Sequence, residues 1–460
     1  MRSIRTPQTI DVHEGTSSRE LRRAWWPALL LVSTLASVPV LAENWPHWRG
    51  PNGSGVSPET KLPESWTNTE NIAWRTRLSG SGVSSPVVWG DRVYTTSQAG
   101  EGVFRQGPRL GQGADASAGE RSLGRSESGA SADVRFVIDA LHRATGVRLW
   151  TFETKAEGEI PAVHDKHNLA SASPVTDGER VVAVFGSGQV VAVDTNGRQL
   201  WTRHLAKEFG VWSINWGNGS SPVVHGTNVI VQAYHQTASY LIALDLRTGA
   251  PTWKTDRPGH LSYSTPIVVP GPAGDELIVN SSVGVEAFDP RTGTSLWNFA
   301  ESNQFPIPVA MHHDGVIYLS RGYRSGPFAA IRPGGRGEIS KSHVLWHVPT
   351  GAPYVASLVH YEGLLYMAGD VGVITAVDAK TGERVWRERL GGIYTASPVA
   401  GDGKIYLLSE DGETIVLRAG RSPQVIARNR IAGRILASPA LSQGRLFIRT
   451  DGEVVAIGAS

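Results

Sequence analysis

The sequence predicts an all-β chain folded as an eight-bladed β-propeller of four-stranded antiparallel blades. Three observations lead to this prediction. A short phrase recurs at intervals of mostly 40 to 50 residues, and the composition combines 52 Gly and 15 Trp with only 19% charged residues. The last repeat is also one strand short, whereas a matching strand stands near the N-terminus. A repeat of this length corresponds to one propeller blade.

Each repeat begins with a Ser-Pro-Val-like start, which we interpret as the opening of the innermost strand of a blade. The first interval is longer because residues 98–133 are inserted; this segment is rich in Gly, Ser, Ala and Arg, and we expect it to be a disordered loop. The starts are SSPVV (84–88), ASPVT (172–176), SSPVV (220–224), STPIV (264–268), IPVAM (307–311), ASLVH (356–360), ASPVA (396–400) and ASPAL (437–441).

The second half of the repeat reads as a hairpin in which a Gly precedes a Trp by four residues. Asp245, Asp289 and Asp378 stand four residues before the Gly, where a short carboxylate can accept hydrogen bonds from turn amides. The Gly can take the positive φ that the turn requires, and the Trp offers a large apolar face to the neighbouring blade. We therefore expect blade docking by Trp74, Trp150, Trp201, Trp253, Trp297, Trp346 and Trp386.

The two ends of the chain complement each other. The eighth repeat, at 438–460, ends without room for a fourth strand, and NIAWRTRL (71–78) carries Trp74 in the register of that strand. The N-terminal strand should therefore complete the last blade, because pairing would cover its exposed edge.

Residues 1–42 have the features of an export signal. Residues 24–42 are apolar and uncharged, they follow Arg22 and Arg23, and the small residue Ala42 suits cleavage before Glu43. A stretch of this length can also span a bilayer, so an uncleaved N-terminal anchor is the alternative; Pro27 and Pro39 favour the signal. We expect a protein of the periplasm, secreted or in the cell envelope, with one domain at 43–460 and any membrane contact made through the N-terminal segment.

Composition excludes several classes of function. A net charge of +2 gives no reason to expect nucleic acid as a partner, and the absence of Cys rules out disulfides and thiolate chemistry. We find no phosphate loop, nucleophile elbow or calcium loop, so no catalytic residue and no metal ligand is assigned.

Two of the hairpins resemble a known family. ALDLRTGAPTW (243–253) and AVDAKTGERVW (376–386) are similar to the A-x-D-x-x-T-G-x-x-x-W signature of the quinoprotein-like propellers, which carry pyrroloquinoline-quinone (PQQ)-like repeats. The resemblance covers about residues 44–460, and NWPHWRGPNGSGVS (44–57) resembles a branch of exported members. The family includes PQQ-dependent alcohol dehydrogenases and the non-enzymatic scaffold of the outer-membrane β-barrel assembly machinery, so the fold does not decide the function.

Unusual residues gather in two loops, 162–170 and 210–219, which precede the second and third starts and should lie side by side at the mouth of the central channel. A lysine there could neutralise a carboxylate, Asn and His could orient polar groups, and an indole could stack on a planar ring or a sugar. Alternatively, the His and Asn side chains bond loop amides and the Trp pair plugs the channel. The candidates are His164, Lys166, His167, Asn168, Trp212, Asn215, Trp216 and Asn218.

Two functions remain open on this basis. The first is a non-catalytic binding or scaffold protein of the cell envelope, whose partner is another envelope protein or a small planar or sugar-like ligand. The alternative is a PQQ-dependent oxidoreductase with the quinone at the channel mouth between blades two and three. The resemblance implies that such dehydrogenases stack PQQ on a disulfide of adjacent cysteines, which this chain lacks. We also find no counterpart of their Asp base and calcium ligands, so the sequence favours the first function.

Overall fold

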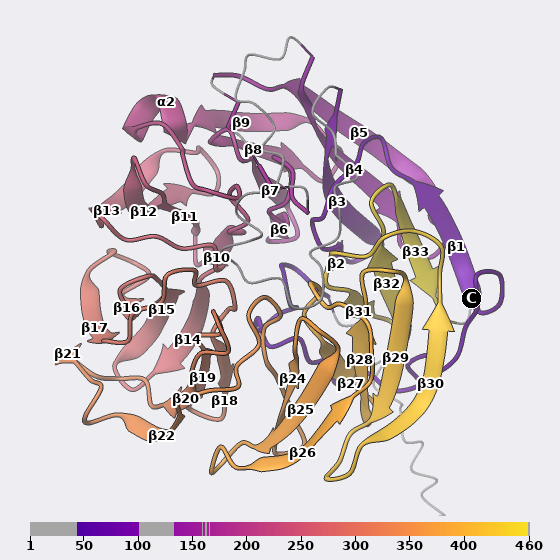
Figure 1. Ribbon diagram of the computed structural model, residues 1–460. Helices are drawn as coiled ribbons and strands as arrows, with labels where there is room; N and C mark the ends of the chain where they lie inside the picture. The colour runs from indigo at the N-terminus through magenta and orange to yellow at the C-terminus, as the bar shows by residue number, and fades with distance from the viewer. Residues whose placement is uncertain (1–43, 101–132, 159, 162, 165, 459–460) are drawn as a thin grey trace, which may run out of the picture. The chain divides into compact units, whose positions relative to one another are not determined.

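The computed structural model describes residues 44–458 except 101–132, 159, 162 and 165, so the predicted signal and most of the insertion lie outside the described residues. The chain divides into two compact units, Met1–Leu41 and Ala42–Ser460, and only the second is described. It forms eight β-sheets, which confirms the eight-bladed propeller (Figure 1). In this part of the chain no helix has both the length and the apolar character needed to cross a membrane.

The first four blades follow one another along the chain, each with its innermost strand first. Blade one contains β2 (Val87–Trp89), β3 (Arg92–Ala99), β4 (Arg135–His142) and β5 (Arg148–Lys155). Blade two contains β6 (Val175–Thr176), β7 (Arg180–Val184), β8 (Gln189–Asp194) and β9 (Gln199–His204). Blade three contains β10 (Val223–His225), β11 (Asn228–Tyr234), β12 (Ser239–Asp245) and β13 (Pro251–Asp256). Blade four contains β14 (Ile267–Gly271), β15 (Gly274–Asn280), β16 (Val285–Phe288) and β17 (Ser295–Phe299).

The remaining blades complete the ring. Blade five contains β18 (Met311–His313), β19 (Val316–Ser320), β20 (Phe328–Ile331) and β22 (Val344–Val348). Blade six contains β23 (Val359–Tyr361), β24 (Leu364–Ala368), β25 (Val373–Asp378) and β26 (Arg384–Arg389). Blade seven contains β27 (Val399–Gly401), β28 (Lys404–Leu408), β29 (Glu413–Arg418) and β30 (Gln424–Arg430). Blade eight contains β31 (Ala440–Ser442), β32 (Arg445–Arg449), β33 (Glu453–Ile457) and the N-terminal strand β1 (Ile72–Arg77).

Three local features differ from the regular repeat that the sequence predicts. The insertion predicted at 98–133 begins later than expected, because Gln98 and Ala99 belong to β3 and pair with β4. A short helix, α2 (Leu205–Phe209), follows β9. The outer hairpin of blade five adds β21 (Gly337–Glu338) in parallel to β17, which gives blade four a fifth strand.

The repeated tryptophans lie between neighbouring blades. In six of them the indole Nε1–H donates to a backbone carbonyl in the outer hairpin of the next blade, at 2.8–3.1 Å. The hairpin glycine is required because a Cβ on Gly197 would come within 2.7 Å of the Trp150 ring. Trp297 differs: its Nε1–H donates to Glu276 of its own blade, and β21 of blade five lies beside it.

The ring closes as the sequence predicts. Strand β1 pairs antiparallel with the last strand, β33, and Trp74 lies opposite Ala456 (Figure 1). The side chain of Trp74 then packs against Gly146 in blade one and donates a hydrogen bond to the Arg143 carbonyl. Blade eight therefore joins both ends of the propeller and docks on blade one.

The segment 44–57 has a role that the sequence did not reveal. It contacts residues in or directly before the innermost strands of blades that lie far apart in the ring, and it must therefore cross the channel. Within it, Arg49 is 1% exposed and donates to the carbonyls of Gly53 and Ser54; burial lowers the pKa of this guanidinium to about 9. The contacts join Trp45 to Val88, Pro46 to Thr176, Arg49 to Leu358 and Val56 to Ala400.

Two truncations separate ring closure from this crossing segment. Removing 44–70 deletes the crossing segment but keeps β1, whereas removing 44–78 also exposes the edge of β33. We expect both truncations to lower the melting temperature measured by circular dichroism, and the second to lower it much further. Equal melting of the 44–78 truncation and the full protein would refute closure by β1.

Candidate functional site

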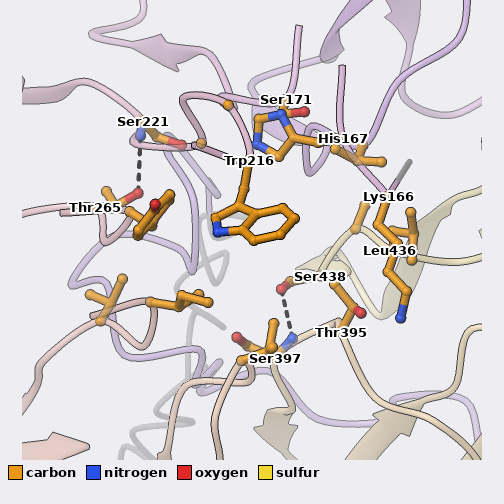
Figure 2. A pocket seen from close by; sticks show the side chains of 18 of the residues that line it. Lys166, His167, Ser171, Trp216, Ser221, Thr265, Thr395, Ser397, Leu436 and Ser438 are labelled. Atoms are coloured by element: carbon orange, nitrogen blue, oxygen red, sulfur yellow. Dashed lines mark hydrogen bonds between the residues drawn. The ribbon is translucent and has the colours of Figure 1, made fainter. Parts of the chain in front are cut away.

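A cavity of about 350 Å³ occupies the channel, and residues from all eight blades line it. The loops before the innermost strands supply much of the lining, together with Trp48 from the crossing segment. Figure 2 shows Trp216 in the middle of this cavity, surrounded by Lys166, His167 and a set of serine and threonine side chains. The cavity is therefore formed by the whole ring and not by one pair of blades.

A belt of hydroxyl groups surrounds the cavity. The belt residue of each blade stands two positions before its innermost strand. In most blades its backbone N–H donates to the side-chain hydroxyl of the belt residue in the next blade. Six such bonds of 2.9–3.0 Å occur, two of them drawn in Figure 2. These buried amides would otherwise lack an acceptor. The belt residues are Ser85, Ser173, Ser221, Thr265, Val309, Ser357, Ser397 and Ser438.

Blade five interrupts the belt. Met311 pairs with Tyr318 as Val87 pairs with Tyr94, which places Val309 at the belt position. The predicted start IPVAM (307–311) is therefore wrong by one residue. Val309 donates its amide to Ser357 but has no hydroxyl to accept one.

Lys166 of blade two reaches across the channel to blade seven. Its Nζ lies 2.7 Å from Oε1 of Glu410, which also accepts a hydrogen bond from Thr395. The two charged side chains are only 14% and 5% exposed. Lys166 thus neutralises a carboxylate of the protein itself, a partner that lies 244 residues away in the sequence.

A second carboxyl group lies close to this ion pair. Asp370 accepts a hydrogen bond from the amide of Val355, a lining residue. Burial raises the pKa of Asp370 to about 6, against the opposing effects of that amide and of Lys166.

His164, His167 and Trp216 form one packed group in the lining. The His164 amide donates to the Trp216 carbonyl, and the two rings meet edge to face with centroids 5.4 Å apart. Gly217 and Gly219 lie so close to His167 that a Cβ on either would come within 2.8 and 3.1 Å of its ring. Burial lowers the pKa of His167 to about 4, so this imidazole is neutral near pH 7.

The other four predicted residues do not line the cavity. Asn168 is fully buried and bonds the backbone of Ser81 and Ala170. Trp212 is 3% exposed and donates to the hydroxyl of Tyr240. Asn218 is buried beside His235, and Asn215 lies outside the lining. Of these residues, Asn168 bonds loop backbone groups, whereas Trp212 and Asn218 contact the buried side chains of Tyr240 and His235.

Four aromatic side chains from blades four to six form a wall of the cavity. Tyr263, Phe305, Tyr323 and Tyr354 lie in sequence around the wall, with neighbouring ring centroids 4.8 to 6.3 Å apart. Sequence reasoning assigned no role to Phe305 or Tyr323. The available signal was the presence of aromatic residues in the mouth loops of blades four to six.

Comparison with known proteins places the chain in a family. A family model described as outer membrane protein assembly factor BamB matches residues 134–318, 338–422 and 370–460. The chain belongs to the BamB family. It is also similar to BamB from Moraxella catarrhalis in structure, with a TM-score of 0.57 and 16% identity over 85% of this chain and 97% of that one.

Two further similarities concern enzymes. The tetrathionate hydrolase of Acidithiobacillus ferrooxidans is 27% identical over 365 residues, which are 74% of this chain and 65% of the hydrolase. This BamB-family chain therefore spans less than two thirds of that protein. Quinohemoprotein alcohol dehydrogenase from Comamonas testosteroni has the same fold, with a TM-score of 0.59 and 14% identity over 91% of this chain and 81% of that one.

The lining of this BamB-family cavity does not fit PQQ, the cofactor of the dehydrogenases. PQQ is a planar tricarboxylate and needs cationic partners, whereas Lys166 is already bonded to Glu410 and lies near Asp370. The residues that the structure describes also include no group of three His, Cys, Asp or Glu placed to hold a metal ion. We therefore derive no step through a quinone.

Breaking the ion pair across the channel should destabilise the protein. Lys166→Met leaves the Glu410 carboxylate buried without its cation, which should cost about 3 kcal/mol of unfolding free energy. Adding Glu410→Gln to Lys166→Met should recover part of this loss, so that the double variant is at least about 1 kcal/mol more stable than additivity predicts. Urea denaturation of wild type, Lys166→Met, Glu410→Gln and the double variant measures this coupling. Additive losses of unfolding free energy would show that the pair does not act as one unit.

The carboxyl group of Asp370 gives a pH dependence of known sign. Its pKa rises from 3.8 in the unfolded chain to about 6 in the folded protein, so the folded state holds this proton more tightly. The protonated Asp370 therefore contributes its full stabilisation of the folded state below pH 3.8, and this contribution is lost as the pH rises through about 6. Asp370→Asn should therefore gain stability relative to wild type between pH 4 and pH 7, measured by thermal melting. A constant difference across this range would contradict the assignment.

Proposed function

We propose that this protein is an exported, non-catalytic binding protein of the cell envelope that holds its ligand or partner at the channel mouth. The supporting observation is the cavity itself, which is built by all eight blades and has its principal charges paired within the protein. A pocket of this kind is already formed before a ligand arrives, which reduces the cost of binding.

Membership of the BamB family supports the envelope setting. The matching family model is named for an outer-membrane assembly factor, and the apolar N-terminal stretch suits export. A scaffold role toward another envelope protein is compatible with the same mouth, because its loops come from every blade.

An enzymatic role is the second candidate, and the similarity to tetrathionate hydrolase is what favours it. In this chain, however, two basic side chains of the mouth offer no free positive charge near pH 7: Lys166 is bonded to Glu410, and His167 has a pKa of about 4. A dianionic substrate would find little positive charge at this lining.

Binding and turnover assays on the purified protein test these functions. PQQ is titrated with and without Ca²⁺ while absorbance and alcohol-dependent dye reduction are recorded, and loss of tetrathionate is followed in a parallel incubation. We expect neither turnover nor stoichiometric PQQ binding at micromolar quinone. Turnover in either assay would overturn the non-catalytic function.

A further inference from the structure

The charges at the cavity indicate what kind of ligand it can hold. Among the described lining residues, Lys166 is the only lysine or arginine. Its ammonium group is bonded to Glu410. An anionic ligand would have to break this pair, and a cationic ligand would meet a carboxylate that is already neutralised. Both would lose solvation without gaining a free counter-charge. The lining therefore favours a neutral ligand.

The belt adds a ring of hydrogen-bond donors. Six belt hydroxyls line the cavity, and five of them accept a backbone N–H from the preceding blade. None of the five donates its own proton to an acceptor among the residues that the structure describes, so each O–H remains available. Accepting a hydrogen bond also polarises a hydroxyl as a donor. The five are Ser173, Ser221, Thr265, Ser397 and Ser438.

Trp216 supplies a flat apolar surface within this ring of donors. It is partly exposed, and its backbone has φ of +79°, which is unfavourable for a bulky side chain and costs about 1 kcal/mol or more. The contacts with His164 and His167 hold the loop in this conformation. The indole Nε1–H has no acceptor in the described part of the chain and can donate to a ligand.

We propose that the cavity binds a neutral saccharide of one or two rings, with a sugar face stacked on Trp216 and sugar oxygens accepting hydrogen bonds from the belt. This rests on the proposed binding function and names its ligand class. An apolar ring face with oxygen atoms around its rim matches an indole surrounded by hydroxyl donors. The volume of about 350 Å³ lies at the small end of the range of ligand pockets, roughly 300–1,000 Å³.

Calorimetric titration of the full protein tests the proposal with defined probes. The neutral probes are glucose, N-acetylglucosamine and maltose, and the anionic probes are glucuronate and tetrathionate. At least one neutral probe should bind with one-to-one stoichiometry, and Trp216→Gly should weaken it about tenfold or more. Because glycine accepts a positive φ, this variant should unfold no more easily than wild type, which separates loss of binding from misfolding.

A matched control uses a tryptophan outside the cavity. Trp89→Phe changes a residue that packs against Gly178, away from the lining, and should leave binding unchanged. Binding of the anionic probes alone would overturn the saccharide assignment while leaving a binding function in place. If none of the neutral probes binds, the saccharide assignment is also overturned. Turnover of PQQ-dependent dye reduction or of tetrathionate would instead overturn the proposed non-catalytic function.

Discussion

The propeller depends on satisfying buried backbone amides where eight short strands converge. In six blades the backbone N–H of the belt residue donates to the belt hydroxyl of the next blade. This requirement explains why Ser or Thr recurs before Pro in the repeat. It also couples each blade to its neighbour at the axis, as the indole hydrogen bonds do near the outer hairpins. The belt then determines the chemistry of the cavity that it surrounds.

The fold was predictable because its determinants are local and repeated. The spacing of Gly and Trp in each hairpin predicted the blades, and the position of Trp74 predicted ring closure, which β1 and β33 confirm. The crossing of the channel by 44–57 was not predictable, since nothing repeats there and its contacts reach blades far apart in sequence. Blade five also departs from the pattern at Val309 and at β21, where its sequence has lost the repeat.

The sequence did not determine the direction of the side chains in the two loops that it singled out. Trp212 and Trp216 are four residues apart, yet the first is buried against Tyr240 and the second lies in the cavity. The positive φ of Trp216 contributes to this difference, and the residue type does not predict such a backbone conformation. The pairing of Lys166 with Glu410 was equally hidden, because it joins blades two and seven across the channel. Asparagines in the same loops bond backbone groups or buried side chains, as polar side chains in buried loops commonly do.

The cavity is thus a preformed, internally neutralised site in which an indole lies within a ring of hydroxyl donors. A crystal structure of the purified protein with maltose tests this most directly. We expect a sugar ring stacked on Trp216, with its oxygens within hydrogen-bond distance of belt residues such as Ser221 and Ser438. Only ordered water along the belt, with maltose absent or bound elsewhere on the surface, would contradict the account.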